Sequence, residues 1–251
     1  MLNNTQVIIL AGGKGTRMKQ DIPKVLTFLG DKVLIEYILS SVNQCNFIIK
    51  PLIVIGYRGE LVKEQLGDGV IYVEQKEQLG TGHAVFCCKN NFSKDAKNIM
   101  ILYGDMPNIK SGTIIKLAEI QNNSDAVLTM MTLSVSDFQE ERKCFYAFGR
   151  IIRNQNKQIK KIVELRDAND DEKNIKELNP SLFCFNKDWL LKNLDNLKNN
   201  NSQNEYYLTD LVGIAIDEGS KINSLTVDPD ECIGVNTVEE LKRAEGIILK
   251  K

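Results

Sequence analysis

The stretch Val7-Ile-Ile-Leu-Ala-Gly-Gly-Lys-Gly-Thr-Arg-Met18 decides the fold, because an apolar run passes directly into a glycine-rich loop. Residues 7–10 form a short apolar run that ends in a turn, which is typical of a buried strand. Glycines at positions 12, 13 and 15 allow backbone conformations that are closed to other residues. They also let amide N–H groups approach a phosphate closely. The stretch therefore predicts a phosphate-binding loop at the end of a strand.

Three cationic side chains, Lys14, Arg17 and Lys24, lie in this loop or just after it. Arginine offers a bidentate fork to a phosphate, and lysine acts as a point charge. Pro23 fixes its own φ and biases Ile22 toward an extended conformation, which would hold Lys24 in a defined place. A glycine-rich turn with solvated lysines is the simpler interpretation. The spacing matches neither a Walker loop nor the Gly-x-Gly-x-x-Gly fingerprint of dinucleotide-binding folds.

The first half of the chain alternates short apolar runs with helical patterns. Apolar runs predict strands at 7–10, 52–55, 70–73 and 99–103, and apolar residues at helical spacing predict helices at 34–42, 60–66, 81–89 and 111–121. Strands separated by helices indicate a mostly parallel sheet with both faces covered. The expected class is therefore α/β, with a Rossmann-like, doubly wound sheet.

The second half is less regular. It predicts strands at 126–135, 149–153, 159–164 and 181–185, helices at 187–197, 208–217 and 237–249, and solvated polar loops at 167–176 and 196–204. No internal repeat and no Pro/Gly/Ser-rich linker interrupts the chain. We therefore expect one domain over 1–251, made of a first half (about 1–125), an inserted β lobe (about 126–236) and a C-terminal helix (237–251).

Composition excludes several classes of protein. The 251 residues carry a net charge of −1, so no basic excess favours nucleic acid or an anionic membrane as a partner. No stretch approaches the roughly 20 apolar residues that a membrane span requires, and the N-terminus has no signal-peptide pattern. Six cysteines without a Cys-x-x-Cys pair, beside the single histidine His83, support a zinc site poorly. These features predict a cytoplasmic protein with reduced thiols.

Eight motifs taken in chain order resemble the uridylyltransferase (pyrophosphorylase) domain of the bacterial bifunctional UDP-N-acetylglucosamine pyrophosphorylase/glucosamine-1-phosphate acetyltransferase. They span nearly the whole chain, and the run Gln78-Leu-Gly-Thr-Gly-His-Ala84 is quite specific to that enzyme. The other seven motifs are Leu10 to Met18, Ile22-Pro-Lys-Val25, Tyr103-Gly-Asp105, Phe148-Gly-Arg-Ile151, Ile162-Val-Glu164, Glu205-Tyr-Tyr-Leu-Thr-Asp210 and Gly234-Val-Asn236.

The resemblance implies a nucleotide-diphospho-sugar transferase fold with a sugar-side lobe, and it implies a role for each matching residue. Arg17 and Lys24 are implied to be catalytic, neutralising charge on the triphosphate and the transferring phosphate. The nucleotide-binding positions are implied to be Leu10, Ala11, Gly12, Gly13, Lys14, Gly15, Thr16, Gln75, Gly80, Thr81, Tyr103, Gly104 and Asp105. The implied sugar-binding residues are Gly149, Glu164 and Asn179, and the implied magnesium ligands are Asp105 and Asn236.

Chemistry supports these assignments, although each has a simpler structural interpretation. Asp105 follows a predicted strand, at the edge of the sheet where ligand crevices form in α/β folds. One carboxylate and one amide oxygen suit Mg²⁺, which keeps waters and takes phosphate oxygens as further ligands. Alternatively, Asp105 caps a turn, Asn236 begins the last helix and Glu164 is a solvated strand end. His83 is interpreted as structural rather than catalytic.

The expected reaction joins a sugar 1-phosphate to a nucleoside triphosphate, with UTP favoured, and releases pyrophosphate. Leu178-Asn-Pro-Ser-Leu182 departs from the family's Asn-Thr-Gly, so another sugar 1-phosphate or phosphorylated alcohol, with UTP, CTP or dTTP, stays open. A non-catalytic nucleotide-sugar-binding module and a metal-dependent glycosyltransferase also stay open. A glycosyltransferase would usually show Asp-x-Asp, whereas Gly104-Asp105-Met106 has one Asp. Because the chain ends at Lys251, we expect no acetyltransferase β-helix and assign no acetyl transfer.

Overall fold

The computed structural model describes residues 4–18 and 20–249 of the chain. Each strand and helix predicted in the first half is present, with ends shifted by a few residues. The strands are β1 (Thr5–Leu10), β4 (Leu52–Ile55), β5 (Ile71–Glu74) and β6 (Asn98–Tyr103). The helices are α1 (Leu34–Gln44), α2 (Gly59–Leu66), α3 (Thr81–Cys87) and α4 (Ser111–Asn122). A short hairpin, β2 (Phe28–Leu29) and β3 (Lys32–Val33), was not predicted.

The central strand β1 pairs in parallel with β4 on one side and with β6 on the other. In this register Leu10 lies opposite both Val54 and Tyr103, so the three strands end together at one edge of the sheet. The residues that follow them are thereby brought side by side, which is the usual position of a ligand crevice in this class of fold.

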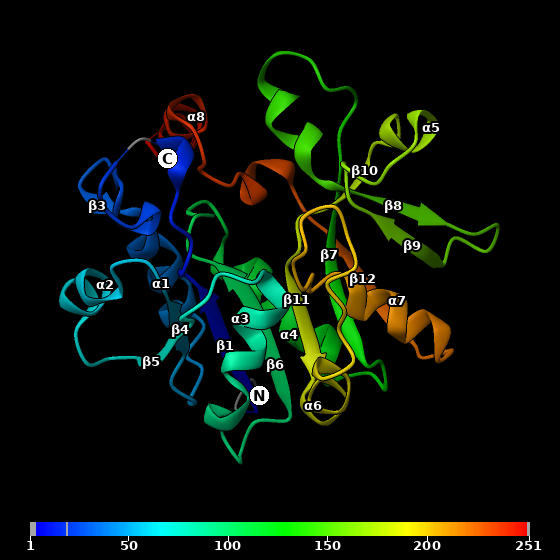
Figure 1. The fold of residues 1–251 in the computed structure, drawn as a ribbon, viewed down its shortest axis with the longest axis horizontal. Helices are drawn as coiled ribbons and strands as arrows, with labels where there is room; N and C mark the ends of the chain where they lie inside the picture. Colours follow the sequence, from blue (N-terminus) through cyan, green and yellow to red (C-terminus); the bar gives the residue numbers. More distant parts are fainter. Residues whose placement is uncertain (1–3, 19, 250–251) are drawn as a thin grey trace.

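Side chains along β1 alternate between two cores because successive residues of a strand point to opposite faces. Val7 and Ile9 belong to the core that packs against α1 and α4, whereas Ile8 belongs to the core that packs against α3. Helices thus cover both faces of the sheet (Figure 1). The expectation of a doubly wound α/β fold is confirmed.

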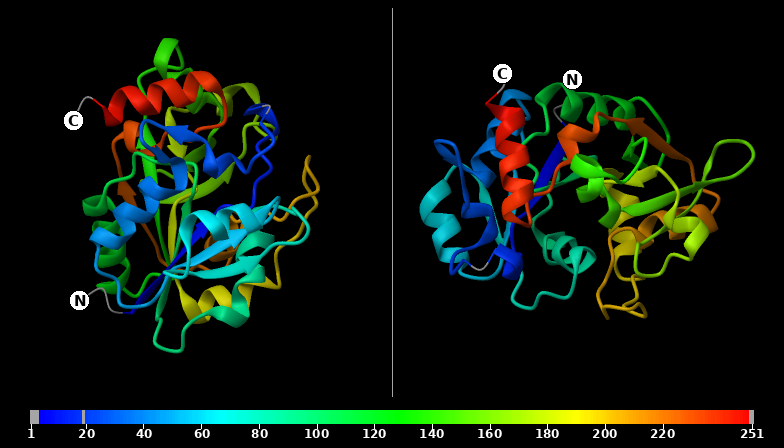
Figure 2. Two further views of the ribbon diagram at one scale, coloured as in Figure 1. Left: turned by 90° about the vertical axis from the view of Figure 1, so that its left-hand side faces the viewer. Right: turned by 90° about the horizontal axis from the view of Figure 1, so that it is seen from above.

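The second half extends this sheet and adds antiparallel strands. Its strands are β7 (Leu128–Ser134), β8 (Gly149–Arg153), β9 (Ile159–Val163), β10 (Glu177–Asn179), β11 (Phe183–Asn186) and β12 (Ile222–Thr226). The strand order is β5-β4-β1-β6-β11-β7-β10-β8-β9, and β12 pairs with β7. Strands β8, β9 and β10 form a lobe, and the turn between β8 and β9 projects from one end of the molecule (Figure 2).

The helices of the second half lie where the sequence predicts them, with some ends shortened. They are α6 (Lys187–Leu194), α7 (Asp210–Asp217) and α8 (Val238–Ile248). Helices α6 and α7 contribute to the core that contains Ile8, whereas α8 returns to the first half and packs near β2 (Figure 1).

Two local predictions are wrong. The stretch 167–176 is not a loop throughout, because α5 spans Asp170–Lys173. Asn169 and Glu172 form a capping box, in which each side chain bonds the backbone of the other, and this stabilises a single helical turn. The strand predicted to begin at residue 181 instead begins at Phe183, because Ser181 has a φ of 61° and cannot extend the strand.

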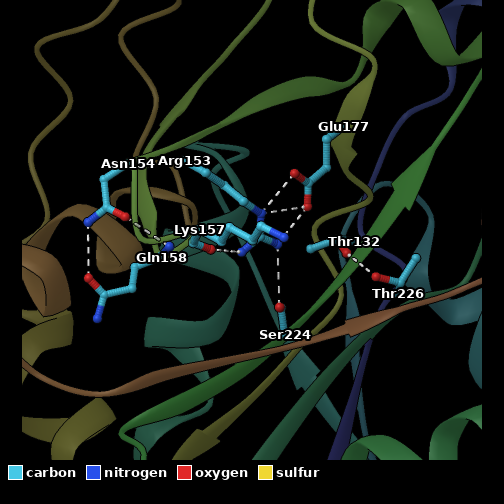
Figure 3. Close-up of polar contacts among 8 residues, drawn as sticks. All are labelled: Thr132, Arg153, Asn154, Lys157, Gln158, Glu177, Ser224 and Thr226. Carbon is cyan, nitrogen blue, oxygen red and sulfur yellow. Dashed lines mark hydrogen bonds and ion pairs between the residues drawn. The ribbon is translucent and has the colours of Figure 1, made fainter.

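Arg153 ties the lobe to the main sheet (Figure 3). Its guanidinium bonds both carboxylate oxygens of Glu177 on β10, at 2.6 Å from Nη2 and 2.8 Å from Nε. It also donates to the Lys157 carbonyl in the β8–β9 turn and to the Ser224 hydroxyl on β12, at 2.8 and 3.4 Å. A bidentate pair fixes geometry as well as charge, so Arg153 holds three strands in one arrangement.

Candidate active site

The glycine-rich loop after β1 passes close to the side chains of Gln75 and Lys24. A Cβ at Gly12 would lie 3.3 Å from Oε1 of Gln75. At Gly15, where φ is +63°, a Cβ would lie 2.6 Å from the Cβ of Lys24. Glycine is therefore required at position 15, by both approach and conformation, whereas a Cβ at position 12 would have to push the Gln75 side chain by a few tenths of an ångström.

A pocket of about 210 Å³ lies at the ends of β1 and β6. Ten of the residues predicted to bind substrate or metal line it: Leu10, Ala11, Gly12, Gly13, Lys24, Gln75, Gly80, Thr81, Tyr103 and Asp105. Four lining residues had no predicted role: Val25, Gln78, Ala84 and Glu205. The tertiary structure thus gathers residues from four separate parts of the chain around one cavity.

Other predicted nucleotide-binding residues lie beside the pocket. The ammonium of Lys14 is 5.2 Å from the ring of Tyr57. The amide of Gly104 donates to the Leu10 carbonyl at 2.9 Å, and a Cβ at Gly104 would lie 3.3 Å from that carbonyl oxygen and 3.0 Å from Cγ1 of Val25. Gly104 therefore allows β1 and β6 to end close together. The side chain of Thr16 lies outside the described part of the chain.

The predicted catalytic and metal residues form one polar cluster. The Lys24 ammonium forms an ion pair with Asp105 and donates to Oδ1 of Asn236 at 2.7 Å. Arg17 donates to the same Asn236 oxygen at 3.0 Å. The side chains of Lys24 and Asp105 are only 13% and 15% exposed, so their charges are partly shielded from water.

Local structure explains how Asn236 reaches this cluster from the far end of the chain. The amide of Val235 donates to the Asp105 carbonyl at 2.9 Å, which joins the two segments. Glu240, on the first turn of α8, accepts hydrogen bonds from the amides of Asn236 and Thr237 at 2.7 and 3.0 Å. Thr237 caps the helix in return, so the capping box also fixes the Asn236 backbone.

The three predicted sugar-side residues also come together. Gly149 at the start of β8 lies opposite Asn179 at the end of β10. A Cβ at Gly149 would lie 3.3 Å from Oε1 of Glu164, so glycine leaves room for that carboxylate. Thr209 donates to the same carboxylate oxygen at 3.1 Å.

Arg150 organises the segment that leads into the sugar side. Its side chain is fully buried, and its guanidinium donates to the carbonyls of Tyr146, Phe148 and Lys173. Because the guanidinium bonds three carbonyls, it fixes the backbone just before Gly149 and joins it to the end of α5. Arg150 therefore supports the site without facing the pocket.

Burial raises the pKa of two groups in and beside the pocket. Burial raises the pKa of the Glu164 carboxyl, while the hydrogen bond from Thr209 acts in the opposite direction and the charge of Asp210 raises it further. Burial also raises the pKa of Tyr103, and the carboxylates of Asp105 and Glu164 add to that effect. Tyr103 therefore lies within electrostatic reach of both halves of the site.

Pro180 and Ser181 depart from the Asn-Thr-Gly pattern of the resembled family, and Ser181 contacts Asn179. Its amide donates to Oδ1 of Asn179 at 2.9 Å, and Nδ2 of Asn179 lies 3.4 Å from the Ser181 hydroxyl. With a φ of 61°, Ser181 holds a left-handed conformation that costs a residue other than glycine about 1 kcal/mol. The serine thus adds a hydroxyl beside the Asn179 amide at some cost in strain.

Sequence reasoning gave no role to Thr209, Gln78 or Glu205, which the structure places in or beside the site. All three belong to motifs that the sequence already singled out. The sequence did not show how these three side chains are oriented, since a motif does not say which of its side chains faces the cavity.

Fold and site together define a nucleotidyltransferase, with a glycine-lined pocket and a cationic cluster at the carboxyl edge of a doubly wound sheet. The chain belongs to the MobA-like NTP transferase domain family, whose model matches residues 7–198.

Curated relatives agree with this assignment. The chain is 40% identical over 246 residues to the bifunctional protein GlmU of Clostridium botulinum (strain Loch Maree), covering 97% of this chain and 52% of that protein. It is 39% identical over 249 residues to the bifunctional protein GlmU of Clostridioides difficile (strain 630), covering 99% and 52%. The chain therefore spans about half the length of these relatives, and the resemblance found in the motifs is confirmed.

Solved structures support the fold. A Bacillus anthracis protein, described as a candidate glucose-1-phosphate thymidylyltransferase in complex with a sucrose, superposes with a TM-score of 0.75 at 21% identity, covering 97% of this chain and 94% of its own. A nucleotidyl transferase from Methanothermobacter thermautotroptrophicus superposes with a TM-score of 0.66 at 16% identity, covering 99% of both chains. Within residues 4–18 and 20–249, no helix is long and apolar enough to cross a membrane.

Proposed function

We propose that this protein catalyses the reaction of UTP with N-acetylglucosamine 1-phosphate to give UDP-N-acetylglucosamine and pyrophosphate. The observation that carries the proposal is the convergence of Lys24, Asp105, Asn236 and Arg17 at the mouth of a glycine-lined pocket. The GlmU relatives, which match over nearly the whole chain, support this choice of reaction.

In the proposed reaction, an oxygen of the sugar phosphate attacks the α-phosphorus of UTP in line, and pyrophosphate leaves on the opposite side. No covalent enzyme intermediate is needed, because the attacking phosphate is already an anion. Repulsion between the two polyanions is the main obstacle, at about 4 kcal/mol per pair of unit charges about 4 Å apart at an effective dielectric constant of about 20. Lys24 and Arg17 offset this repulsion and stabilise the charge on the leaving group.

We propose Mg²⁺ as the cofactor, held by Asp105 and Asn236. The donor set fits this ion, because a carboxylate and an amide oxygen already face a single cation, the Lys24 ammonium. Among the described residues, no group of three or more His, Cys, Asp or Glu side chains could hold a metal. Two protein oxygens suit an ion that takes its other ligands from water and phosphate. When bound, Mg²⁺ would supply charge neutralisation at the phosphates.

One observation supports a second candidate, in which the sugar differs from N-acetylglucosamine. Ser181 stands where the Asn-Thr-Gly pattern of the resembled family has glycine, and it engages the side chain of Asn179. That contact changes the group offered to the substituent on the sugar ring. In this second candidate the chemistry stays the same and the sugar 1-phosphate changes.

We further propose that residues 1–251 act as one nucleotidyltransferase domain, with the nucleotide bound in the first half and the sugar in the inserted lobe. The six cysteines are all free, which supports a reducing compartment and hence a cytoplasmic enzyme.

A pyrophosphate-release assay over a matrix of triphosphates and sugar 1-phosphates tests the proposal, with Mg²⁺ present throughout. The proposal expects the highest kcat/KM for UTP with N-acetylglucosamine 1-phosphate. Faster release with another sugar supports the second candidate. If every pair gives no release while a nucleotide sugar still binds by calorimetry, the chain is a binding module and the proposed reaction is wrong.

A further inference from the structure

The side-chain amide of Gln75 is held from two sides. Its Nε2 donates to the Gly80 carbonyl at 3.0 Å and lies 3.1 Å from Nδ1 of His83. Its backbone is fixed as well, since its amide donates to the Ile55 carbonyl at 2.8 Å and Gln78 donates to its carbonyl at 3.2 Å. Gln75 is only 5% exposed, so alternative rotamers have little space.

These contacts determine which end of the amide faces the pocket. A carbonyl oxygen only accepts hydrogen bonds, so the group opposite Gly80 must be the amide nitrogen. The second hydrogen on that nitrogen points at Nδ1 of His83, which must then carry a lone pair. His83 Nε2 lies 3.8 Å from the Sγ of Cys87, where it holds the ring proton of this tautomer.

With both amide hydrogens engaged, Gln75 has only its oxygen left for a ligand. Oε1 faces the glycine-rich loop, 3.3 Å from the position of a Cβ at Gly12, and Gln75 lines the pocket. Among residues 4–18 and 20–249, no donor forms a hydrogen bond to Oε1. The pocket wall at this point therefore presents a fixed acceptor with a free lone pair.

We propose that His83 is a positioning residue that selects uracil over cytosine by holding the oxygen of Gln75, rather than its nitrogen, toward the base. Uracil carries an N3–H donor on its pairing edge, whereas cytosine carries an acceptor at N3. A fixed acceptor bonds the first base and repels the second. The inference rests on the proposed function in one respect, namely that the pocket takes a pyrimidine nucleotide.

Without an acceptor at position 83, one amide hydrogen loses its partner and the constraint on Gln75 weakens. A rotated amide would offer its nitrogen to the base, and a nitrogen donor suits N3 of cytosine. His83 also stacks on Phe86, with ring centroids 6.4 Å apart. If His83 had only this structural role, its replacement would lower stability and leave the preference between bases unchanged.

The test measures the Kd of UTP and of CTP by calorimetry, with Mg²⁺ and no sugar phosphate. It compares the wild type with His83→Leu, which removes the acceptor, and His83→Asn, whose side-chain oxygen can take the place of Nδ1. Phe86→Leu is the matched control, because it changes packing on the same face of α3 and removes no polar group. Thermal melting of each variant reports folding.

We expect His83→Leu to weaken UTP binding about tenfold, the effect of losing roughly one hydrogen bond, and to reduce the preference for UTP over CTP by at least as much. His83→Asn is expected to restore the preference to within about threefold of the wild type, less than the effect of one hydrogen bond. Phe86→Leu is expected to keep it.

An unchanged UTP/CTP ratio in His83→Leu overturns the inference, as does an equal loss of preference in Phe86→Leu. A wild type that binds both nucleotides equally also overturns it. The proposed reaction is judged separately, by pyrophosphate release from the wild type. A protein that prefers UTP through His83 but releases no pyrophosphate would refute the reaction and leave the selection of uracil intact.

Discussion

Replacing Lys24 with methionine removes the ammonium that lies between Asp105 and Asn236 and keeps an unbranched side chain next to Gly15. The 13% and 15% exposure of the Lys24 and Asp105 side chains puts the pair between surface and core, where an effective dielectric constant of about 20 applies. One charge about 4 Å from a phosphate is then worth about 4 kcal/mol. Expressed fully in the transition state, this corresponds to about 10³-fold in rate.

The assay is pyrophosphate release at saturating UTP, N-acetylglucosamine 1-phosphate and Mg²⁺. We expect Lys24→Met to lower kcat by about 10³-fold. Lys110→Met is the matched control, because Lys110 forms an ion pair at 3.1 Å with Glu231, whose side chain is only 8% exposed. Both variants leave a shielded carboxylate without its lysine, but Lys110 does not line the pocket.

Comparable losses of thermal stability are expected in the two variants, with a loss of activity only in Lys24→Met. The reasoning is refuted if Lys24→Met retains more than about a tenth of the wild-type kcat, since 1.4 kcal/mol or less would then be at stake. It is also refuted if Lys110→Met loses as much activity, because the effect would then belong to the fold.

Three further variants test the proposed metal and sugar-binding residues. Asp105→Asn should raise the Mg²⁺ concentration for half-maximal activity about tenfold or more, as seen in a Mg²⁺ titration of pyrophosphate release. Glu164→Gln should raise the KM for the sugar phosphate about tenfold, the loss of a charged hydrogen bond, with little change for UTP. Burial raises the pKa of Glu164 in the folded protein, so the wild type loses stability as pH rises through that pKa. Glutamine does not titrate, so the melting temperature of Glu164→Gln minus that of the wild type should be larger at pH 8 than at pH 4. Ser181→Gly should lower the KM for N-acetylglucosamine 1-phosphate about threefold, by relieving strain and freeing Asn179, and an unchanged KM would exclude a role in sugar choice.

Long apolar runs made much of the fold predictable. The strands β1, β4 and β6 are buried on both faces and therefore appear in the sequence as continuous apolar segments. The strands that were missed lack this pattern. β10 has three residues, and β12 is partly exposed with only two apolar residues, Ile222 and Leu225, so its pairing with β7 is what makes it a strand.

The residues of the candidate site were also predictable only in part. The glycines, Lys24 and Asp105 could be singled out because their residue types and neighbours indicate phosphate and metal chemistry. The role inferred for His83 could not, because it depends on which amide end of Gln75 meets the Gly80 carbonyl. Likewise, Asn236 lies near Asp105 because the backbone amide of Val235 donates a hydrogen bond to the Asp105 carbonyl, and the sequence does not show that contact.

The sequence by itself determined the class of fold, the position of the glycine-rich loop and the polar residue types near it, because hydrophobic periodicity and glycine spacing are local properties of the chain. The tertiary structure alone decided which of those side chains share a cavity and in which direction their donors and acceptors point. The physical reason is that parallel strands end at one edge whatever their separation along the chain, and that a polar side chain takes its orientation from the groups packed around it.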